Sequence, residues 1–226
     1  MNALRTAILV DGGFYRKRAK HLWGEKTAED RARELEEYCR AHIGFQKRSG
    51  ECYLYRIFYY DCAPSSKRIF HPFTQKQVDL SKTELYTWTM SFLSELKKKR
   101  KFAIRLGKLA EEQAHYTIYP KTVKKLCNGS ISFSDLKESD FYLNIDQKGV
   151  DMKIGLDISS MAYKKQVDQI VLISGDSDFV PAAKLARREG IDFILDPLGA
   201  PIKPDLFEHI DGLRTCDNRY TVHTHK

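Results

Sequence analysis

The sequence predicts an α/β fold with one doubly wound, mostly parallel sheet that carries helices on both faces. Short apolar segments rich in β-branched and aromatic residues alternate with segments of ten or more residues that have helical periodicity, and this alternation is typical of parallel sheets. The apolar segments are closed by turn residues, as is common for buried parallel strands. No internal repeat, low-complexity tract or long linker divides the chain, so we expect a single domain over residues 1–226.

The first part of the chain has clear strand and helix signals. The run Thr6–Val10 is apolar and is followed by Asp11-Gly12-Gly13, which predicts a buried strand that ends in a turn. The aromatic run Cys52–Tyr60 predicts a second strand, which ends at Asp61. Between them we expect helices over residues 14–23 and 27–43, the second with Leu35, Tyr38, Cys39 and His42 near one face.

Residues 62–101 have the character of an insertion into this frame. Pro64 and Pro72 interrupt regular structure. A helix follows, which ends in the basic run Lys97–Lys101, where positive charge suits the carboxyl end of the helix dipole. The apolar positions that predict this helix are Leu85, Trp88, Phe92 and Leu96.

The second half of the chain returns to alternation after a polar stretch. Residues 110–147 match neither the strand nor the helix pattern, and we assign them no structure. The predicted elements around this stretch are a strand over 102–109, a helix over 150–163, a strand over 169–174, a helix over 177–189 closed by Gly190, and a strand over 191–195.

Composition and cysteine usage narrow the class of protein. The 38 Lys and Arg residues exceed the 30 Asp and Glu residues, and the net charge of +8 favours a polyanionic partner. The five cysteines are scattered and include no CxxC pair, which predicts free thiols in a reducing compartment and argues against a zinc ribbon. No apolar run approaches the roughly 20 residues that cross a bilayer, and the N-terminal residues do not have the pattern of a signal peptide. We therefore expect a cytoplasmic protein with no membrane partner.

Carboxylates follow several of the predicted strands. Asp11, Asp61, Asp176 and Asp196 each stand at or just after the end of one. Asp178 and Asp151 begin two of the predicted helices. Ligands of open parallel sheets bind beyond the carboxyl ends of the strands, and clustered carboxylates suit a hard cation such as Mg²⁺ or Mn²⁺. An acidic pocket in a basic protein is what metal-assisted hydrolysis of a phosphodiester requires.

Each of these carboxylates also has a purely structural interpretation. Asp178 is well placed to cap a helix, and Asp11 before two glycines is a common turn residue. Asp61 and Asp196 fit a turn better than a ligand. Asp157 lies six residues after Asp151, about 120° around a helix, so it cannot point in the same direction as Asp151, and we interpret it as a structural residue or one that supports the ligands from behind.

Other catalytic templates are absent from the sequence, and basic residues flank the predicted site. The chain has no P-loop, no GxGxxG after a strand, no GxSxG elbow and no HExxH. Arg16, Lys17 and Lys148 are candidates for contact with a phosphate backbone. Tyr15, Tyr59 and Tyr60 fit either base stacking or the core, and we favour the core.

Three motifs together resemble the NYN domain in its LabA-like branch, which belongs to the PIN-like group of nucleases. They are Ile8-Leu9-Val10-Asp11-Gly12-Gly13, Gln147-Lys148-Gly149-Val150-Asp151 with Leu156-Asp157, and Ser174-Gly175-Asp176-Ser177-Asp178-Phe179. The resemblance implies a PIN-like sheet and a Mg²⁺- or Mn²⁺-dependent ribonuclease. It implies that Asp11, Asp151, Asp176 and Asp178 are the catalytic and metal-binding set, with Asp157 as a weaker metal ligand.

One position departs from the family pattern and leaves alternatives open. Phe14 stands where many NYN proteins have Asn. The leading hypothesis is an endoribonuclease, and the alternative is a catalytically weak or inactive RNA-binding or regulatory protein. The preference for RNA over DNA rests on the resemblance alone, so a DNA-directed nuclease stays open, as does a homo-oligomer.

Overall fold

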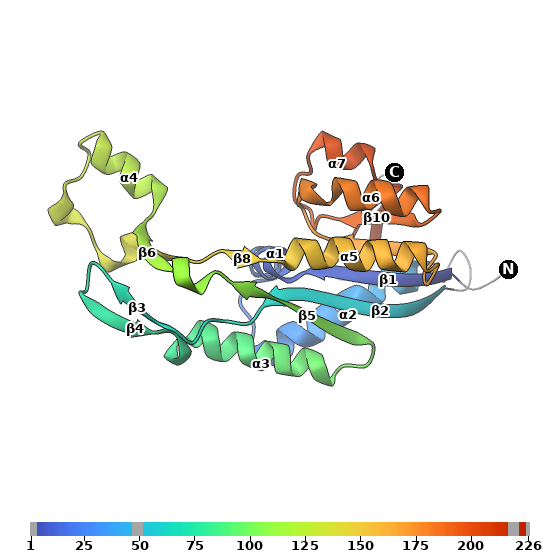
Figure 1. Ribbon diagram of the computed structural model, residues 1–226, viewed down its shortest axis with the longest axis horizontal. Helices are drawn as coiled ribbons and strands as arrows, with labels where there is room; N and C mark the ends of the chain where they lie inside the picture. The colour runs from blue at the N-terminus through green and yellow to red at the C-terminus, as the bar shows by residue number, and fades with distance from the viewer. Residues whose placement is uncertain (1–3, 47–51, 217–221, 225–226) are drawn as a thin grey trace. The chain divides into compact units, whose positions relative to one another are not determined.

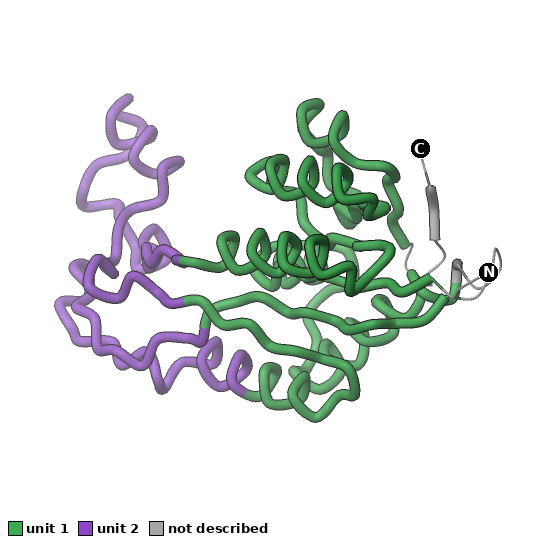
Figure 2. Tube along the Cα trace, turned by 45° about the vertical axis from the view of Figure 1, so that its right-hand side comes forward, with its two compact units in different colours: residues 1–62, 91–107, 149–226 green, residues 63–90, 108–148 purple. Residues whose placement is uncertain are grey.

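The computed structural model describes residues 4–46, 52–216 and 222–224. The chain divides into two compact units, coloured separately in Figure 2. Unit 1 contains residues 1–62, 91–107 and 149–226, and unit 2 contains residues 63–90 and 108–148. Unit 2 therefore takes residues 63–90 from the predicted insertion at 62–101 and adds the stretch for which the sequence indicates no structure, whereas residues 91–101 belong to unit 1.

Unit 1 is built on a mostly parallel sheet, as the sequence predicts. Its strand order is β12-β11-β10-β9-β1-β2-β5, and every described neighbour is parallel except β12, which runs antiparallel to β11. The strands are β1 (Leu4–Asp11), β2 (Cys52–Cys62), β5 (Phe102–Leu109, whose last two residues lie in unit 2), β9 (Gln169–Ile173), β10 (Asp192–Asp196), β11 (Gly212–Cys216) and β12 (Val222–Thr224).

Helices cover both faces of this sheet. Helices α5 and α6 pack against each other on one side, and α1 and α2 pack on β2 from the other side (Figure 1). This division follows from right-handed crossovers, because the chain moves across the sheet in opposite directions in its two halves. The helices are α1 (Gly12–Trp23), α2 (Ala28–Gln46), α3 (Glu84–Lys98, shared between the units), α5 (Val150–Tyr163), α6 (Val180–Arg188), α7 (Pro204–Glu208) and the 3₁₀ turn η5 (Ser177–Phe179).

The core of unit 1 lies on the central strands. Ala7–Val10 of β1 and Ile170–Ile173 of β9 have no exposed surface, because a parallel strand covered on both faces buries every side chain. Tyr15, Tyr59 and Tyr60 are also fully buried. The expectation that these tyrosines belong to the core is confirmed, and the alternative that they stack on bases is wrong.

The predicted elements of unit 1 agree with the structure to within a few residues. The main difference is at 177–189, where the sequence predicts one helix and the structure has the turn η5 followed by α6. Pro181 stands in the first turn of α6, a position that proline favours and at which its missing N–H costs nothing. All five cysteines lie in the described ranges as free thiols. None of the helices in those ranges has the length and apolar character to span a membrane.

Unit 2 consists of short antiparallel pairs. Its hairpin β3 (Arg68–His71) and β4 (Lys76–Asp79) contacts the pair β6 (His115–Ile118) and β7 (Phe141–Asn144), and the ring of His71 packs 4.2 Å from that of Tyr116, measured between centroids. The other elements of unit 2 are α4 (Pro120–Cys127), β8 (Gln147–Lys148), which pairs with the end of β5, and the 3₁₀ turns η1 (Leu80–Lys82), η2 (Glu111–Gln113), η3 (Phe133–Asp135) and η4 (Glu138–Asp140).

Candidate functional site

Asp11 is held where β1 passes into α1. Its carboxylate caps the helix by accepting a hydrogen bond from the backbone N–H of Phe14 at 3.1 Å. The helix begins tight against β2, since a Cβ at Gly12 would lie 2.5 Å from the ring carbon Cζ and the hydroxyl oxygen of Tyr59. The turn of β1 into α1 therefore fixes the position of the Asp11 carboxylate.

The loop after β9 is tied to Asp11 through Ser174. Ser174 donates from Oγ to Oδ2 of Asp11 at 3.3 Å, and the same Oγ accepts a hydrogen bond from the backbone N–H of Asp176 at 3.3 Å. Asp176 in turn caps η5 by accepting from the backbone N–H of Asp178 at 3.1 Å. The capping role considered for Asp178 thus belongs to Asp176. Ser174, which the sequence places in a motif but not in the candidate set, links the two loops.

Electrostatics join the four carboxylates into one group. Burial raises the pKa of Asp11 above its ordinary value, and the charges of Asp151 and Asp61 raise it further. Partial burial likewise raises the pKa of Asp151, which stands in the first turn of α5, and the charges of Asp176 and Asp178 add to this rise. We call these four residues, Asp11, Asp151, Asp176 and Asp178, the Asp cluster.

The Asp cluster suits a hard cation by its chemistry rather than by a closed coordination shell. Its side-chain donors are carboxylate oxygens, and a divalent ion would offset the burial and the neighbouring negative charge that raise the pKa of Asp11 and Asp151. Within the part of the chain that the structure describes, no three His, Cys, Asp or Glu side chains are grouped closely enough to ligate one ion directly. Mg²⁺ commonly keeps several of its waters when protein carboxylates hold it.

Phe14 lies against the loop that carries this cluster. A Cβ built on Gly175 would stand 2.6 Å from Cε2 of the Phe14 ring. Gly175 is the residue between Ser174 and Asp176, so the ring packs on the backbone that joins two of the functional positions. A side chain at position 175 would therefore require the Phe14 ring to move.

Comparison with known proteins bears on the same residues. Residues 91–199 match the NYN domain family. The matched segment includes Asp151, Asp176 and Asp178 and does not reach back to Asp11. NYN domains are PIN-like and nuclease-like, and the mostly parallel sheet of unit 1 is consistent with that fold.

Solved structures extend the likeness in fold. The chain is similar to a protein of unknown function from Vibrio parahaemolyticus RIMD 2210633, with a TM-score of 0.50 and 14% sequence identity over 96% of each chain. No curated protein sequence is significantly similar to the chain. The structural likeness therefore concerns the fold.

Two other strand-end carboxylates, Asp61 and Asp196, have surroundings that differ from those of the Asp cluster. Asp61 is fully buried and accepts from Nη2 of Arg16 at 3.0 Å and from the hydroxyl of Tyr59 at 2.8 Å. Asp196 is fully buried as well, and the atoms that surround it are the hydroxyl of Tyr38 (2.5 Å), Nε2 of His42 (2.8 Å), the N–H of Leu198 (2.8 Å) and the hydroxyl of Thr215 (3.1 Å). Both carboxylates are parts of internal networks rather than simple turn residues.

Asp157 is hydrogen-bonded to side chains outside the Asp cluster. Its Oδ2 accepts from the hydroxyl of Tyr60 at 2.8 Å and from Nε of Arg105 at 3.1 Å. The structure therefore brings Asp157 to the face of β2 and β5 and shows it with these two side chains.

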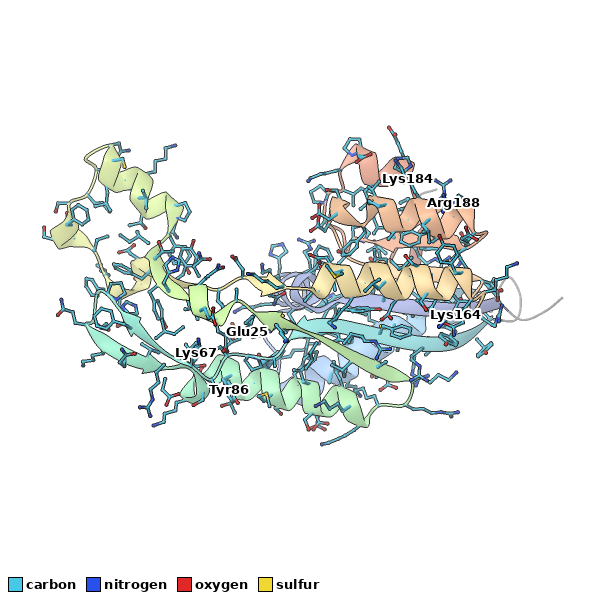
Figure 3. The ribbon with its side chains drawn as sticks, in the orientation of Figure 1. Glu25, Lys67, Tyr86, Lys164, Lys184 and Arg188 are labelled. Carbon is cyan, nitrogen blue, oxygen red and sulfur yellow. The ribbon has the colours of Figure 1, made fainter. Side chains whose placement is uncertain are left out.

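The basic residues predicted to contact nucleic acid occupy different environments. Arg16 turns its guanidinium to Asp61, and its side chain is 23% exposed. Lys17 on α1 is exposed, and Lys148 is exposed on β8 of unit 2. Further exposed positive charge lies on α6 at Lys184 and Arg188, and at Lys164 after α5 (Figure 3).

Proposed function

We propose that the protein is a metal-dependent endoribonuclease of the LabA-like NYN branch, with the Asp cluster as its active site. The observation that supports this proposal is that the loop after β9 is hydrogen-bonded to Asp11 through Ser174 and carries Asp176 and Asp178, whose charges add to the effect of burial in raising the pKa of Asp151. None of the four forms an ion pair with a basic side chain among the residues that the structure describes. The NYN match of residues 91–199 supports nuclease chemistry for this arrangement.

The residues of the Asp cluster have separate tasks in this proposal. Asp11, Asp151 and Asp176 would hold one or two Mg²⁺ or Mn²⁺ ions, and Asp178 would add a further ligand or orient the attacking water. The ion, when bound, would activate that water and stabilise the leaving oxygen. Ser174 keeps Asp11 and Asp176 in register through its two hydrogen bonds.

Substrate binding in this proposal uses positive charge outside the cluster. Lys17 and Lys148 meet the phosphates of the RNA backbone. Arg16 contributes from beside Asp61, which holds its guanidinium in place. The preference for RNA over DNA rests on the likeness to the LabA-like branch.

The decisive experiment compares Asp176→Asn with a matched control. Labelled RNA of mixed structure and its DNA equivalent are incubated with Mn²⁺, Mg²⁺ or EDTA. Asp176→Asn should lower the rate of RNA cleavage by at least about a hundredfold, because it removes a charge that stabilises the ion and the transition state. Asp205→Asn on α7, which removes an exposed carboxylate, should cleave as the wild type does. Full activity in Asp176→Asn overturns the proposal.

A second function is favoured by the position of Phe14. A protein that binds RNA without cutting it would tolerate a ring packed on Gly175 in place of a polar side chain. It predicts RNA binding that persists in EDTA, weakens with salt and yields no product. Phe14→Asn decides between the two, with Phe14→Leu as the control that keeps the position apolar. Cleavage by Phe14→Asn but not by the wild type or Phe14→Leu would show that the protein derives from a nuclease and that Phe14 inactivates it. No cleavage by any variant would support a protein that only binds RNA.

A further inference from the structure

A pocket of about 320 Å³ lies in unit 1 on the face where Asp157 stands. Its walls come from β2, β5, α5 and the residues just after α5. Arg56 and Phe58 belong to β2 and point to the same face because they are two residues apart on a strand. The volume is at the lower end of the range for pockets that bind small molecules, about 300–1,000 Å³.

Arg105 in this pocket is held in place by two neighbours. Its guanidinium carbon lies 5.4 Å from the centroid of the Phe58 ring, a cation–π contact, and its Nε donates to Oδ2 of Asp157 at 3.1 Å. Asp157 is itself fixed by the hydroxyl of Tyr60 at 2.8 Å. Burial and the nearby Asp157 charge raise the pKa of Tyr60, so its hydroxyl keeps its proton and stays a donor. Tyr60 and Asp157 therefore set the direction of the Arg105 guanidinium.

The charge of the pocket favours an anion. Arg56 is exposed and makes no ion pair within the described ranges, and Arg105 uses only its Nε on Asp157. The lining of the pocket thus includes two arginines and one carboxylate, and that carboxylate already accepts two hydrogen bonds. A guanidinium binds phosphate through paired N–H donors, and its flat face also stacks on a nucleobase.

We propose that this pocket binds a phosphate-bearing nucleotide, with Arg105 and Arg56 on the phosphate and Asp157 as the residue that positions Arg105. The nucleotide is either a free mononucleotide or one unit of an RNA strand. Asp157 lies six residues beyond Asp151 on α5, which is about 9 Å along the helix axis and about 120° around it. The pocket is therefore separate from the Asp cluster. Only the strand alternative rests on the proposed ribonuclease function.

The experiment measures binding in EDTA, so that its result does not depend on cleavage. The probes are uridine 5′-monophosphate, uridine and an eight-residue oligouridine, each titrated into the full chain. Arg105→Gln and Arg56→Gln should each weaken binding of the monophosphate by about tenfold, since each removes a charged hydrogen-bond donor. Asp157→Asn should cause a smaller loss, because it leaves the Arg105 charge in place. Arg33→Gln on α2, which removes the same charge from an exposed side chain, is the matched control.

The outcomes separate the two sources of nucleotide and the two proposals. Binding of the monophosphate but not of uridine, lost in Arg105→Gln and kept in Arg33→Gln, supports a free nucleotide. If Arg105→Gln weakens binding of the oligouridine alone, the pocket binds one unit of an RNA strand. Equal binding of the monophosphate and uridine, no binding of any probe to the wild type, or equal effects of Arg105→Gln and Arg33→Gln overturns the inference. Binding of the monophosphate is measured in EDTA and without cleavage, so failure of the nuclease proposal leaves this result unchanged.

Discussion

Carboxylates at the carboxyl end of this sheet fall into two groups with opposite surroundings. Asp61 and Asp196 are fully buried, and each is surrounded by donors that include a basic side chain and a tyrosine hydroxyl. The Asp cluster is less buried and meets backbone N–H groups, one serine and other carboxylates. Aspartates at the same edge of the sheet thus have hydrogen-bond donors for their charge in the first group, whereas in the second group Asp11 and Asp151 are close to other negative charges.

This difference separates stability from function. A buried carboxylate with a full set of donors contributes to the fold, and removal of either partner leaves a buried group unpaired. A carboxylate whose pKa is raised by burial and by neighbouring carboxylates, as for Asp11 and Asp151, reduces stability in the absence of a cation and is characteristic of sites that bind one. The predictions below test this distinction between Asp61 and the Asp cluster.

The largest expected effect is on stability, for Asp61→Ala. This change leaves Arg16, which is 23% exposed, without its ion pair and removes the acceptor of the fully buried Tyr59 hydroxyl. The free energy of unfolding should fall by about 3–5 kcal/mol, measured by urea denaturation. Asp205→Ala, an exposed site on α7, should change it little. A loss below about 1 kcal/mol for Asp61→Ala would contradict the conclusion that Asp61 stabilises the fold.

The second effect is stabilisation by divalent metal. An ion that binds only the folded protein should raise the free energy of unfolding by about 2.7 kcal/mol at a concentration one hundred times the Kd. The rise is measured as the shift in Tm between EDTA and saturating Mg²⁺ or Mn²⁺. Asp151→Asn should lose most of this shift, and Asp205→Asn should keep it. An equal shift in all three proteins would show that the ion binds elsewhere.

The strands and helices of unit 1 could be predicted because their signals are local. The run Thr6–Val10 and the helix over 150–163 are visible in short windows of sequence, and the structure has β1 and α5 at these places. Strand-end carboxylates could also be recognised, because parallel topology brings the ends of strands to one edge. Unit 2 could not be predicted in the same way. Its strands have about four residues, and β6 pairs with β7 although a helix, α4, lies between them in the sequence.

The partners of the buried carboxylates could not be predicted because they are distant in sequence. In the sequence, Tyr38 and His42 are recognisable only as two residues on one face of a predicted helix. The carboxylate that they contact, Asp196, is more than 150 residues away. Arg16 likewise meets Asp61, 45 residues away, although its sequence context suggests a phosphate contact. Asp157 finds Arg105 and Tyr60 by the same kind of long-range pairing. The sequence shows which groups are polar, whereas the tertiary fold decides which of them are neutralised.

A smaller effect with the opposite sign is expected for Asp11→Asn. Burial and neighbouring carboxylates raise the pKa of Asp11, so its charge costs free energy at neutral pH. Asn keeps an oxygen that can accept from the N–H of Phe14 and caps a helix about as well as Asp. In EDTA at pH 7 we expect the variant to be more stable than the wild type by roughly 0.5–2 kcal/mol. A clear loss of stability would mean that the Asp11 charge is compensated within the fold.

The smallest effect is the pH dependence of that difference. A carboxyl whose pKa is raised by folding holds its proton more tightly in the folded state than in the unfolded state. Its contribution to stability is present below the ordinary Asp value of 3.8 and is lost as the pH rises through the raised pKa. The gap in free energy of unfolding between Asp11→Asn and the wild type in EDTA should therefore widen as the pH rises above about 4 and level off once Asp11 is ionised. Saturating Mg²⁺ should narrow the gap, because the ion needs the ionised form that the wild type alone supplies. A gap that stays constant with pH would show that folding does not raise the pKa of Asp11, and would contradict its place in the Asp cluster.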